Sequence, residues 1–229
     1  MEKIFESLKI QIEEGAKQNL QKFCDYLLEN NKKFNLTAIR DKASVYEKHF
    51  ADSLTGLKFF KEGVKILEVG SGGGFPSVPL KIANPNLDFT LLEATGKKCA
   101  FLNGVKDLFN FDKFEVVNAR AEEFAKTPAR ESYDIVTARA VASLNVLCEL
   151  CLPFLKVGGV ALFYKQESKQ EFEEGQKAIK LLGGKIDSVY EYFLPSSKEQ
   201  VRNIIVIKKV SPTPDKYPRE YKKILKTPL

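Results

Sequence analysis

An apolar run, Val64-Lys65-Ile66-Leu67, leads directly into the glycine-rich stretch Glu68-Val69-Gly70-Ser71-Gly72-Gly73-Gly74. An apolar run followed by such a loop predicts a buried strand that ends where bare backbone approaches a ligand. Glycine has no Cβ, so it adopts positive φ at little cost and lets amide groups come close to a bound molecule. The stretch therefore predicts a site for a nucleotide-type cofactor and leaves open which cofactor binds there.

The rest of the chain places this strand in a larger sheet. Further strand-like runs occupy residues 89–92, 114–117, 133–137 and 160–164, and each, like 64–69, precedes a segment with helical spacing. Near-continuous apolar strands that alternate with helices predict a parallel sheet covered on both faces. Two more runs, at residues 186–193 and 201–208, are joined by a loop that permits only an antiparallel pair. Five parallel strands closed by such a pair resemble the seven-stranded, Rossmann-like sheet of class I methyltransferases.

The glycine loop separates this fold from a dinucleotide-binding one. The fingerprint G-x-G-x-x-G, started at Gly70, requires glycine at position 75, where the chain has Phe75. The arrangement present, an acid followed by three alternate glycines from Glu68 to Gly74, resembles the first motif of enzymes that use S-adenosylmethionine. A sulfonium cofactor has no pyrophosphate, so the loop is expected to approach its methionine half. We expect Gly70 and Gly72 there, with the Glu68 carboxylate near the ammonium group.

Acidic side chains follow the next two strands. Glu93 lies about twenty residues after the loop, the position from which a carboxylate accepts hydrogen bonds from ribose hydroxyls. The turn after the third strand holds Ala121 and Glu122, which we expect at the adenine pocket because ligands lie beyond the carboxyl ends of the strands. Lys97 and Lys98 open the helix after Glu93 and face either the substrate or solvent.

The chain divides into three parts. Residues 1–60 form a predicted helical extension packed on the core, with one helix from Ile4 to about Leu28 and another through residues 46–54. Residues 61–210 carry the strands and form the predicted methyltransferase domain. From Lys208 onward seven basic residues accompany two acids, and prolines punctuate residues 211–229. We therefore predict a basic tail that buries little surface and either contacts RNA phosphates or only aids solubility.

Length and composition exclude several classes of protein. A chain of 229 residues, of which 44% are hydrophobic and 29% charged, buries a substantial core. No apolar run approaches the roughly 20 residues that span a bilayer, and the amino end lacks a signal-peptide core, so we expect a cytoplasmic protein. Cys148 and Cys151 lie in a helical stretch, where two buried thiols are favoured over a metal or redox site.

Several motifs occur in one order, beginning with Asn31-Lys32-Lys33-Phe34-Asn35-Leu36-Thr37 and with His49 followed by Asp52-Ser53-Leu54. The later motifs are Phe75-Pro76, Gly96-Lys97-Lys98, Ala119-Arg120-Ala121-Glu122-Glu123, and Ala138-Arg139-Ala140 with Ala142-Ser143-Leu144. Over about residues 30–208 they resemble the glucose-inhibited division protein B family, also called RsmG. Its members are bacterial methyltransferases that act on guanine N7 of small-subunit (16S) ribosomal RNA. The chain departs from the commoner family pattern at Gly73, Ser77, Ala121 and Gln166.

The resemblance implies a set of site residues. Cofactor contacts carried over from the family fall on Gly70, Phe75, Glu93, Ala94, Thr95, Ala121, Glu122 and Arg139. Arg139 is expected to face both cofactor and RNA, and with Lys165 it is a candidate for positioning the substrate. Phosphate contacts are expected from Arg120, Lys97 and Lys98. The implied partner is small-subunit ribosomal RNA or the small ribosomal subunit, and the protein is expected to be a monomer without a metal.

Chemistry at guanine N7 needs no general base, because N7 carries a lone pair and no proton. The target guanine is expected in a loop or distorted segment, since the deep major groove of A-form RNA hides N7. The resemblance makes His49, the only histidine, a candidate for holding the N-terminal helices over the site. Two alternatives stay open: a small-molecule methyltransferase on the same sheet, and a non-enzymatic, nucleotide-responsive RNA-binding protein.

Overall fold

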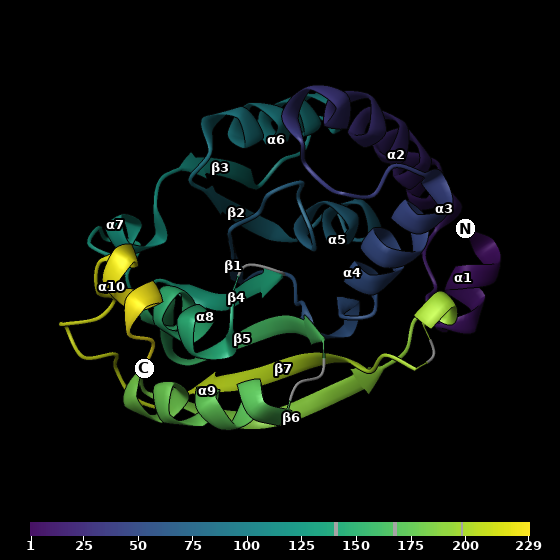
Figure 1. The fold of residues 1–229 in the computed structure, drawn as a ribbon. Helices are drawn as coiled ribbons and strands as arrows, with labels where there is room; N and C mark the ends of the chain where they lie inside the picture. Colours follow the sequence, from purple (N-terminus) through teal and green to yellow (C-terminus); the bar gives the residue numbers. More distant parts are fainter. Residues whose placement is uncertain (140–141, 167–168, 198) are drawn as a thin grey trace.

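A seven-stranded sheet forms the centre of the computed structural model, which describes residues 1–139, 142–166, 169–197 and 199–229 (Figure 1). The strand order is β3-β2-β1-β4-β5-β7-β6. The strands are β1 (Lys65–Val69), β2 (Asp88–Glu93), β3 (Phe114–Asn118), β4 (Tyr133–Arg139), β5 (Leu155–Gln166), β6 (Gly184–Tyr192) and β7 (Arg202–Lys209). β1 to β5 run parallel, whereas β7 is antiparallel to β5 and β6. The predicted class I methyltransferase sheet with an antiparallel last strand is confirmed.

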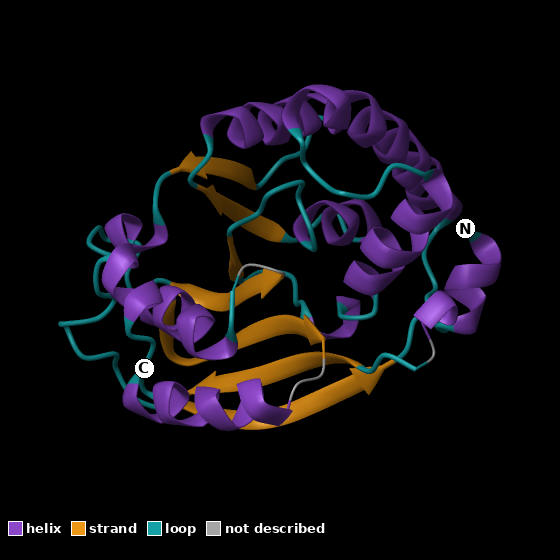
Figure 2. Cartoon of the chain, in the orientation of Figure 1, coloured by secondary structure: helices purple, strands orange, loops and turns teal. Residues whose placement is uncertain are grey.

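Helices cover both faces of the sheet (Figure 2). One face carries α5 (Ser77–Ala83) and α6 (Gly96–Phe109) with the N-terminal helices, and the other carries α8 (Leu144–Cys151) and α9 (Lys169–Leu181). Ile66 of β1 belongs to the first apolar core and Leu67 to the second, because successive side chains point to opposite faces. Short helical elements also occur, namely the α-helix α7 (Ala121–Phe124) and the 3₁₀ helices η2 (Leu57–Phe59), η3 (Leu152–Phe154) and η4 (Pro195–Ser197). No helix among the described residues is long and apolar enough to cross a membrane.

The N-terminal helical region contains a break that the sequence pattern did not predict. α1 (Glu2–Ser7) ends two residues before Lys9, which has a φ of 56°, and α2 (Glu14–Phe34) begins only after residues 10–13, which form no helix. The prediction of one helix from Ile4 to about Leu28 is therefore wrong in its first part. Leu8 and Ile12 still pack against the core, so the apolar spacing continues across the break and hides it.

A second helical segment joins this region to the carboxyl edge of the sheet. α3 (Lys42–Val45), the π-turn η1 (Tyr46–Ala51) and α4 (Asp52–Leu54) follow one another without interruption, which confirms the helix predicted through residues 46–54. Asp41 caps the segment by accepting a hydrogen bond from the Ser44 amide at 2.8 Å. The segment carries His49 and Asp52, and both of these side chains contact Arg139 at the end of β4.

The C-terminal segment, residues 210–229, is packed on the core. Arg130 donates to the carbonyl oxygens of Tyr217 and Thr213 at 2.7 and 2.8 Å, and α10 (Tyr221–Lys226) buries Ile224 completely. The prediction of a tail that buries little surface is therefore wrong. Composition shows the charges and prolines of the segment, but it does not show that Tyr217 and Ile224 fill places in the second apolar core.

Candidate functional site

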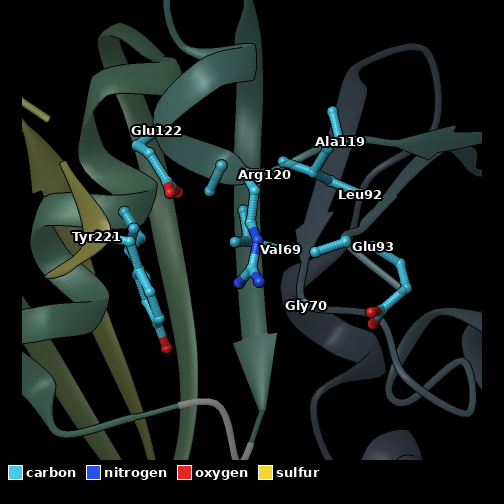
Figure 3. A pocket seen from close by; sticks show the side chains of 11 residues that line it. Val69, Gly70, Leu92, Glu93, Ala119, Arg120, Glu122 and Tyr221 are labelled. Atoms are coloured by element: carbon cyan, nitrogen blue, oxygen red, sulfur yellow. The ribbon is translucent and has the colours of Figure 1, made fainter. Parts of the chain in front are cut away.

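A cavity of ≈ 110 Å³ opens at the carboxyl ends of β1, β2 and β3 (Figure 3). It lies beside the point where the strand order reverses, between β1 and β4, and open α/β sheets bind ligands at such a point. Five of the predicted cofactor contacts line the cavity: Gly70, Glu93, Ala94, Ala121 and Glu122. Tertiary structure thus brings together residues that the sequence places after three different strands.

The glycine-rich loop turns at this edge through three glycines with positive φ: 72° at Gly70, 54° at Gly72 and 82° at Gly74. A Cβ at Gly74 would lie 2.4 Å from Cγ2 of Val78, so a larger residue does not fit there. The Gly70 amide donates to the Leu92 carbonyl oxygen at 2.8 Å and ties the start of the loop to the end of β2. The loop therefore presents bare backbone to the cavity, as the sequence indicated.

Glu93 is held by backbone amides on both sides. Its Oε2 accepts a hydrogen bond from the Gly72 amide at 2.9 Å, and its Oε1 accepts one from the Thr95 amide at 2.8 Å. The residue is only 6% exposed, and these charge-assisted bonds compensate its burial. Each carboxylate oxygen has further acceptor capacity for a ligand hydroxyl. Gly72 and Thr95, both predicted cofactor contacts, lie behind Glu93 and do not line the cavity themselves.

Arg120 and Tyr221 also line the cavity. The Arg120 guanidinium carbon lies 5.5 Å from the centre of the Tyr221 ring, and Figure 3 shows the two side chains next to each other. The sequence predicts Arg120 at RNA phosphates, whereas the structure places it at the same cavity as Glu93. Tyr221 was not predicted from the sequence, because no local motif links a C-terminal helix to the ends of β1, β2 and β3.

A second cavity, of ≈ 370 Å³, lies at the carboxyl ends of β4 and β5. Four basic residues, Lys48, Arg139, Lys165 and Arg202, line it together with Asp52. The two predicted positioning residues, Arg139 and Lys165, therefore meet here and not in the first cavity. Ala140, which belongs to the motif at the end of β4, lies outside the described residues.

Arg139 is locked against the N-terminal helices. Its Nη1 lies 2.9 Å from Asp52 Oδ2, and its Nη2 donates to the Lys48 carbonyl oxygen at 2.8 Å and to His49 Nδ1 at 2.7 Å. Arginine only donates, so His49 Nδ1 accepts, and the ring donates from Nε2 to Thr37 Oγ1 at 2.7 Å. Burial, followed by the nearby Arg139 charge, lowers the pKa of His49 to about 3 and keeps the ring neutral. His49 thus ties the helices to the sheet, as the resemblance implied.

Phe75 and Glu68, both predicted cofactor contacts, line neither cavity. The Phe75 ring stacks on His49 with 4.2 Å between ring centres, beneath the N-terminal helices. Glu68 is fully buried behind the glycine loop, and neither of its carboxylate oxygens has a hydrogen-bond partner among the described residues. Burial raises the pKa of Glu68 to about 8, and nearby Ser77 and Arg139 only partly oppose this effect.

The raised pKa of Glu68 predicts a pH dependence of stability. Between the ordinary value of 4.5 and about 8, folded Glu68 keeps a proton that the unfolded chain has released. Its contribution to stability is therefore present below about pH 4.5 and lost as pH rises through 8. We expect the free energy of unfolding of Glu68→Gln to rise relative to wild type between these pH values, by up to about 1.4 kcal/mol per pH unit. Urea unfolding without cofactor measures this, and a constant difference would contradict it.

Lys97 and Lys98 follow Gly96 in the first turn of α6, and Lys97 is exposed while Lys98 is half-buried. Neither lies in the lining of the two cavities, so they stay predicted RNA contacts. Cys148 and Cys151 are buried in α8 as free thiols, in agreement with their helical spacing. No group of side chains suited to holding a metal ion occurs in the part of the chain that the structure describes.

The chain is similar in sequence to a family model and to proteins that share one name. A family model described as "GidB: rRNA small subunit methyltransferase G" matches residues 16–205. Ribosomal RNA small subunit methyltransferase G of Acetivibrio thermocellus is 47% identical over 207 residues, which cover 90% of this chain and 85% of that protein. The protein of the same name from Caldanaerobacter subterraneus subsp. tengcongensis is 44% identical over 226 residues, which cover 97% of this chain and 94% of that protein.

Solved structures share the fold at low sequence identity. A SAM dependent methyltransferase from Aquifex aeolicus aligns with a TM-score of 0.55 and 16% identity, covering 73% of this chain and 94% of that chain. Precorrin-6y C5,15-methyltransferase from Geobacter metallireducens aligns with a TM-score of 0.52 and 18% identity, covering 69% of this chain and 86% of that chain. These likenesses agree with the class I sheet. Since the family model spans most of the chain and the named relatives exceed 40% identity, the chain belongs to the GidB family of rRNA small subunit methyltransferases G.

Proposed function

We propose that this chain transfers a methyl group from S-adenosylmethionine to N7 of a guanine in small-subunit (16S) ribosomal RNA. One observation carries the proposal. The glycine loop and Glu93 lie together at a cavity beside the point where the strand order reverses, between β1 and β4. The family to which the chain belongs, and the printed names of its relatives, support ribosomal RNA of the small subunit as substrate. The guanine and its N7 follow from the resemblance of the sequence motifs.

The residues around the first cavity have the chemistry that the cofactor requires. Glu93 offers acceptor oxygens to ribose hydroxyls, and Ala121 and Glu122 border the place expected for the adenine. The backbone of Gly70 suits the methionine half. Glu68 is fully buried directly behind the loop, and its oxygens have no hydrogen-bond partner among the described residues; an ammonium group beside it would favour its charged form and oppose the burial that raises its pKa.

When bound, the cofactor supplies an electrophilic methyl group on a sulfonium centre. Guanine N7 attacks through its in-plane lone pair, so no side chain is required to remove a proton. The task of the protein is then positioning, which contributes about 7–11 kcal/mol in favourable intramolecular cases. We therefore assign no catalytic acid or base, and we expect no single residue outside the cofactor and RNA contacts to be essential for the chemical step.

The second cavity is where we propose that the RNA binds. It opens at the same edge of the sheet as the first cavity, and its basic side chains suit phosphate groups of a loop or distorted segment. Lys165 is oriented there by the Ala142 carbonyl oxygen, to which its Nζ donates at 2.7 Å, and by an ion pair with Glu171. Arg139 forms a wall of the cavity and positions the N-terminal helices. We propose that the enzyme acts in the cytoplasm as a monomer.

Removing one basic group of the second cavity is expected to weaken RNA recognition selectively. Lys165→Ala should lower kcat/KM for the RNA by at least about 10-fold, because hydrogen bonds to charged groups contribute about 1.5–3 kcal/mol. The dissociation constant of S-adenosylmethionine should not change. Lys177→Ala, which removes an exposed lysine of α9, is the matched control. Steady-state methylation measures the effect, and an equal loss in both variants would contradict a role for this cavity.

Radiolabelled methyl transfer to purified small subunits and to their naked RNA, with mapping of the labelled base, tests the function. Label at N7 of a guanine supports the proposal. Transfer to a small molecule without labelling of RNA would identify a small-molecule methyltransferase instead. Binding of cofactor and RNA without turnover would identify a non-enzymatic RNA-binding protein.

A further inference from the structure

The C-terminal segment reaches the first cavity although it lies beyond residues 16–205, the region that the family model matches. Its helix α10 contributes Tyr221 to the lining, while Leu150 of α8 and the strand ends supply other parts. The Tyr221 ring lies against Arg120, whose guanidinium carbon is 5.5 Å from the ring centre (Figure 3). An aromatic ring and a guanidinium plane from two distant parts of the chain therefore border one cavity.

We propose that Tyr221 is a cofactor-binding residue, whose ring, with the Arg120 guanidinium against it, forms the wall that holds the nucleoside end of the cofactor. The proposal rests on the proposed function in one respect, since it takes the first cavity as the cofactor site. Glu93 and Glu122 line the same cavity and identify this end, because carboxylates accept hydrogen bonds from ribose hydroxyls and from an adenine amino group. Aromatic and guanidinium planes both pack against the face of a purine.

A buried ion pair fixes the chain just before Tyr221. Arg219 donates from Nε and Nη2 to the two carboxylate oxygens of Glu149, at 2.7 and 2.6 Å, and its amide donates to Oε1 at 2.9 Å. Glu149 is fully buried in α8, and the next residue, Leu150, lines the cavity. A bidentate arginine–carboxylate contact of this kind has a specific geometry, so it fixes where the C-terminal segment packs on α8. Leu150, which lines the cavity, and Glu149, which anchors the segment, thus belong to the same helix.

An apolar contact fixes α10 just after Tyr221. Ile224 is fully buried in the second apolar core, whereas Leu225, its neighbour on the same helix, is 51% exposed. Tyr221 and Ile224 are three residues apart and share one face of the helix, which is the face turned toward the core. With anchors on both sides, the Tyr221 ring is held in place before a ligand arrives, and little ordering is required on binding.

Isothermal titration of the full-length protein without RNA tests this role. Tyr221→Ala is expected to raise the dissociation constant of S-adenosylmethionine about 10-fold, as loss of one base-stacking aromatic ring does elsewhere. S-adenosylhomocysteine and adenosine should lose affinity by a similar factor, because all three carry the nucleoside. Tyr221→Phe keeps the ring and should bind as the wild type does. Leu225→Ala shortens an exposed side chain of the same helix and serves as the matched control.

Each outcome separates this proposal from the proposed function. If the wild type binds the cofactor and Tyr221→Ala binds it equally well, the role of Tyr221 is overturned while the methyltransferase assignment stands. If the wild type binds none of the three ligands, the assignment of the cavity itself fails. A loss confined to the two sulfur-containing ligands would overturn the nucleoside end as the place of contact. Should Tyr221→Ala not fold, Arg120→Ala tests the same wall, with a loss of several-fold expected and unchanged affinity counting against it.

Discussion

An Arg139→Ala variant is expected to lose about 3–5 kcal/mol of unfolding free energy, the effect of removing one partner from a buried ion pair. Arg139 is 11% exposed and its partner Asp52 only 1%, so the variant leaves the buried Asp52 carboxylate without its nearest cation. The variant also leaves the Lys48 carbonyl oxygen and His49 Nδ1 without the donor that they share. Urea or thermal unfolding of the full chain measures the loss.

Two further variants show whether the loss comes from the ion pair. Arg202→Ala removes a second, more exposed arginine that lies 3.3 Å from Asp52 Oδ1, and we expect it to cost less than Arg139→Ala. Asp52→Asn combined with Arg139→Met should recover part of the stability, because neither member of the pair is then left charged and buried. A loss below about 1 kcal/mol for Arg139→Ala is typical of exposed ion pairs that solvent screens. Such a result would refute the role of Arg139 and Asp52 as a buried, stabilising ion pair.

A Glu93→Ala variant is expected to bind S-adenosylmethionine at least about 100-fold more weakly, as isothermal titration without RNA would show. The substitution removes the proposed acceptor of the ribose hydroxyls, and hydrogen bonds to charged groups contribute about 1.5–3 kcal/mol each. It also releases the amides of Gly72 and Thr95, which the carboxylate holds at 2.9 and 2.8 Å. The glycine loop and the start of α6 then lose their common support.

Two further variants, one at Glu93 and one at Glu123, check the expected loss of cofactor affinity. Glu93→Gln keeps one acceptor oxygen but turns an amide group toward a backbone N–H, so an intermediate loss of affinity is expected. Glu123→Ala removes an exposed acid of α7, next to Glu122 but outside the cavity lining, and should leave cofactor affinity unchanged. A change of less than about 3-fold in Glu93→Ala would mean that Glu93 only supports the loop, and the ribose contact would be withdrawn.

The sheet was predictable because its signals are local. Each buried parallel strand is a short apolar run, and the break of the dinucleotide fingerprint at Phe75 lies within a few residues of the loop that it describes. Local signals do not show the break at Lys9, where the chain leaves the helix while Leu8 and Ile12 keep the apolar spacing. In the C-terminal segment, charge and proline content say nothing about the core that receives Ile224.

The site was predictable only in part, for a related reason. Gly70, Glu93 and Glu122 lie at or just after the carboxyl ends of parallel strands. Such ends meet at one edge of a sheet, so the sequence could place these residues together. Arg139 lies at the end of a strand too, yet its side chain turns toward the N-terminal helices, because Asp52 and His49 lie there. A strand end locates a residue along the edge of the sheet, but it does not determine which of two neighbouring cavities the side chain joins.

The sequence by itself determined the class I sheet, the glycine loop and the family, since each depends on residues close together in the chain. Only the tertiary structure decided that two separate cavities form at the carboxyl edge of the sheet. It alone placed Arg120 beside Tyr221, and Arg219 on the buried carboxylate of Glu149. These contacts join residues 70 or more positions apart, and each depends on how α8 and α10 pack. No periodicity or local motif encodes such packing, because it is settled by the shapes and charges of surfaces that meet only after the chain folds.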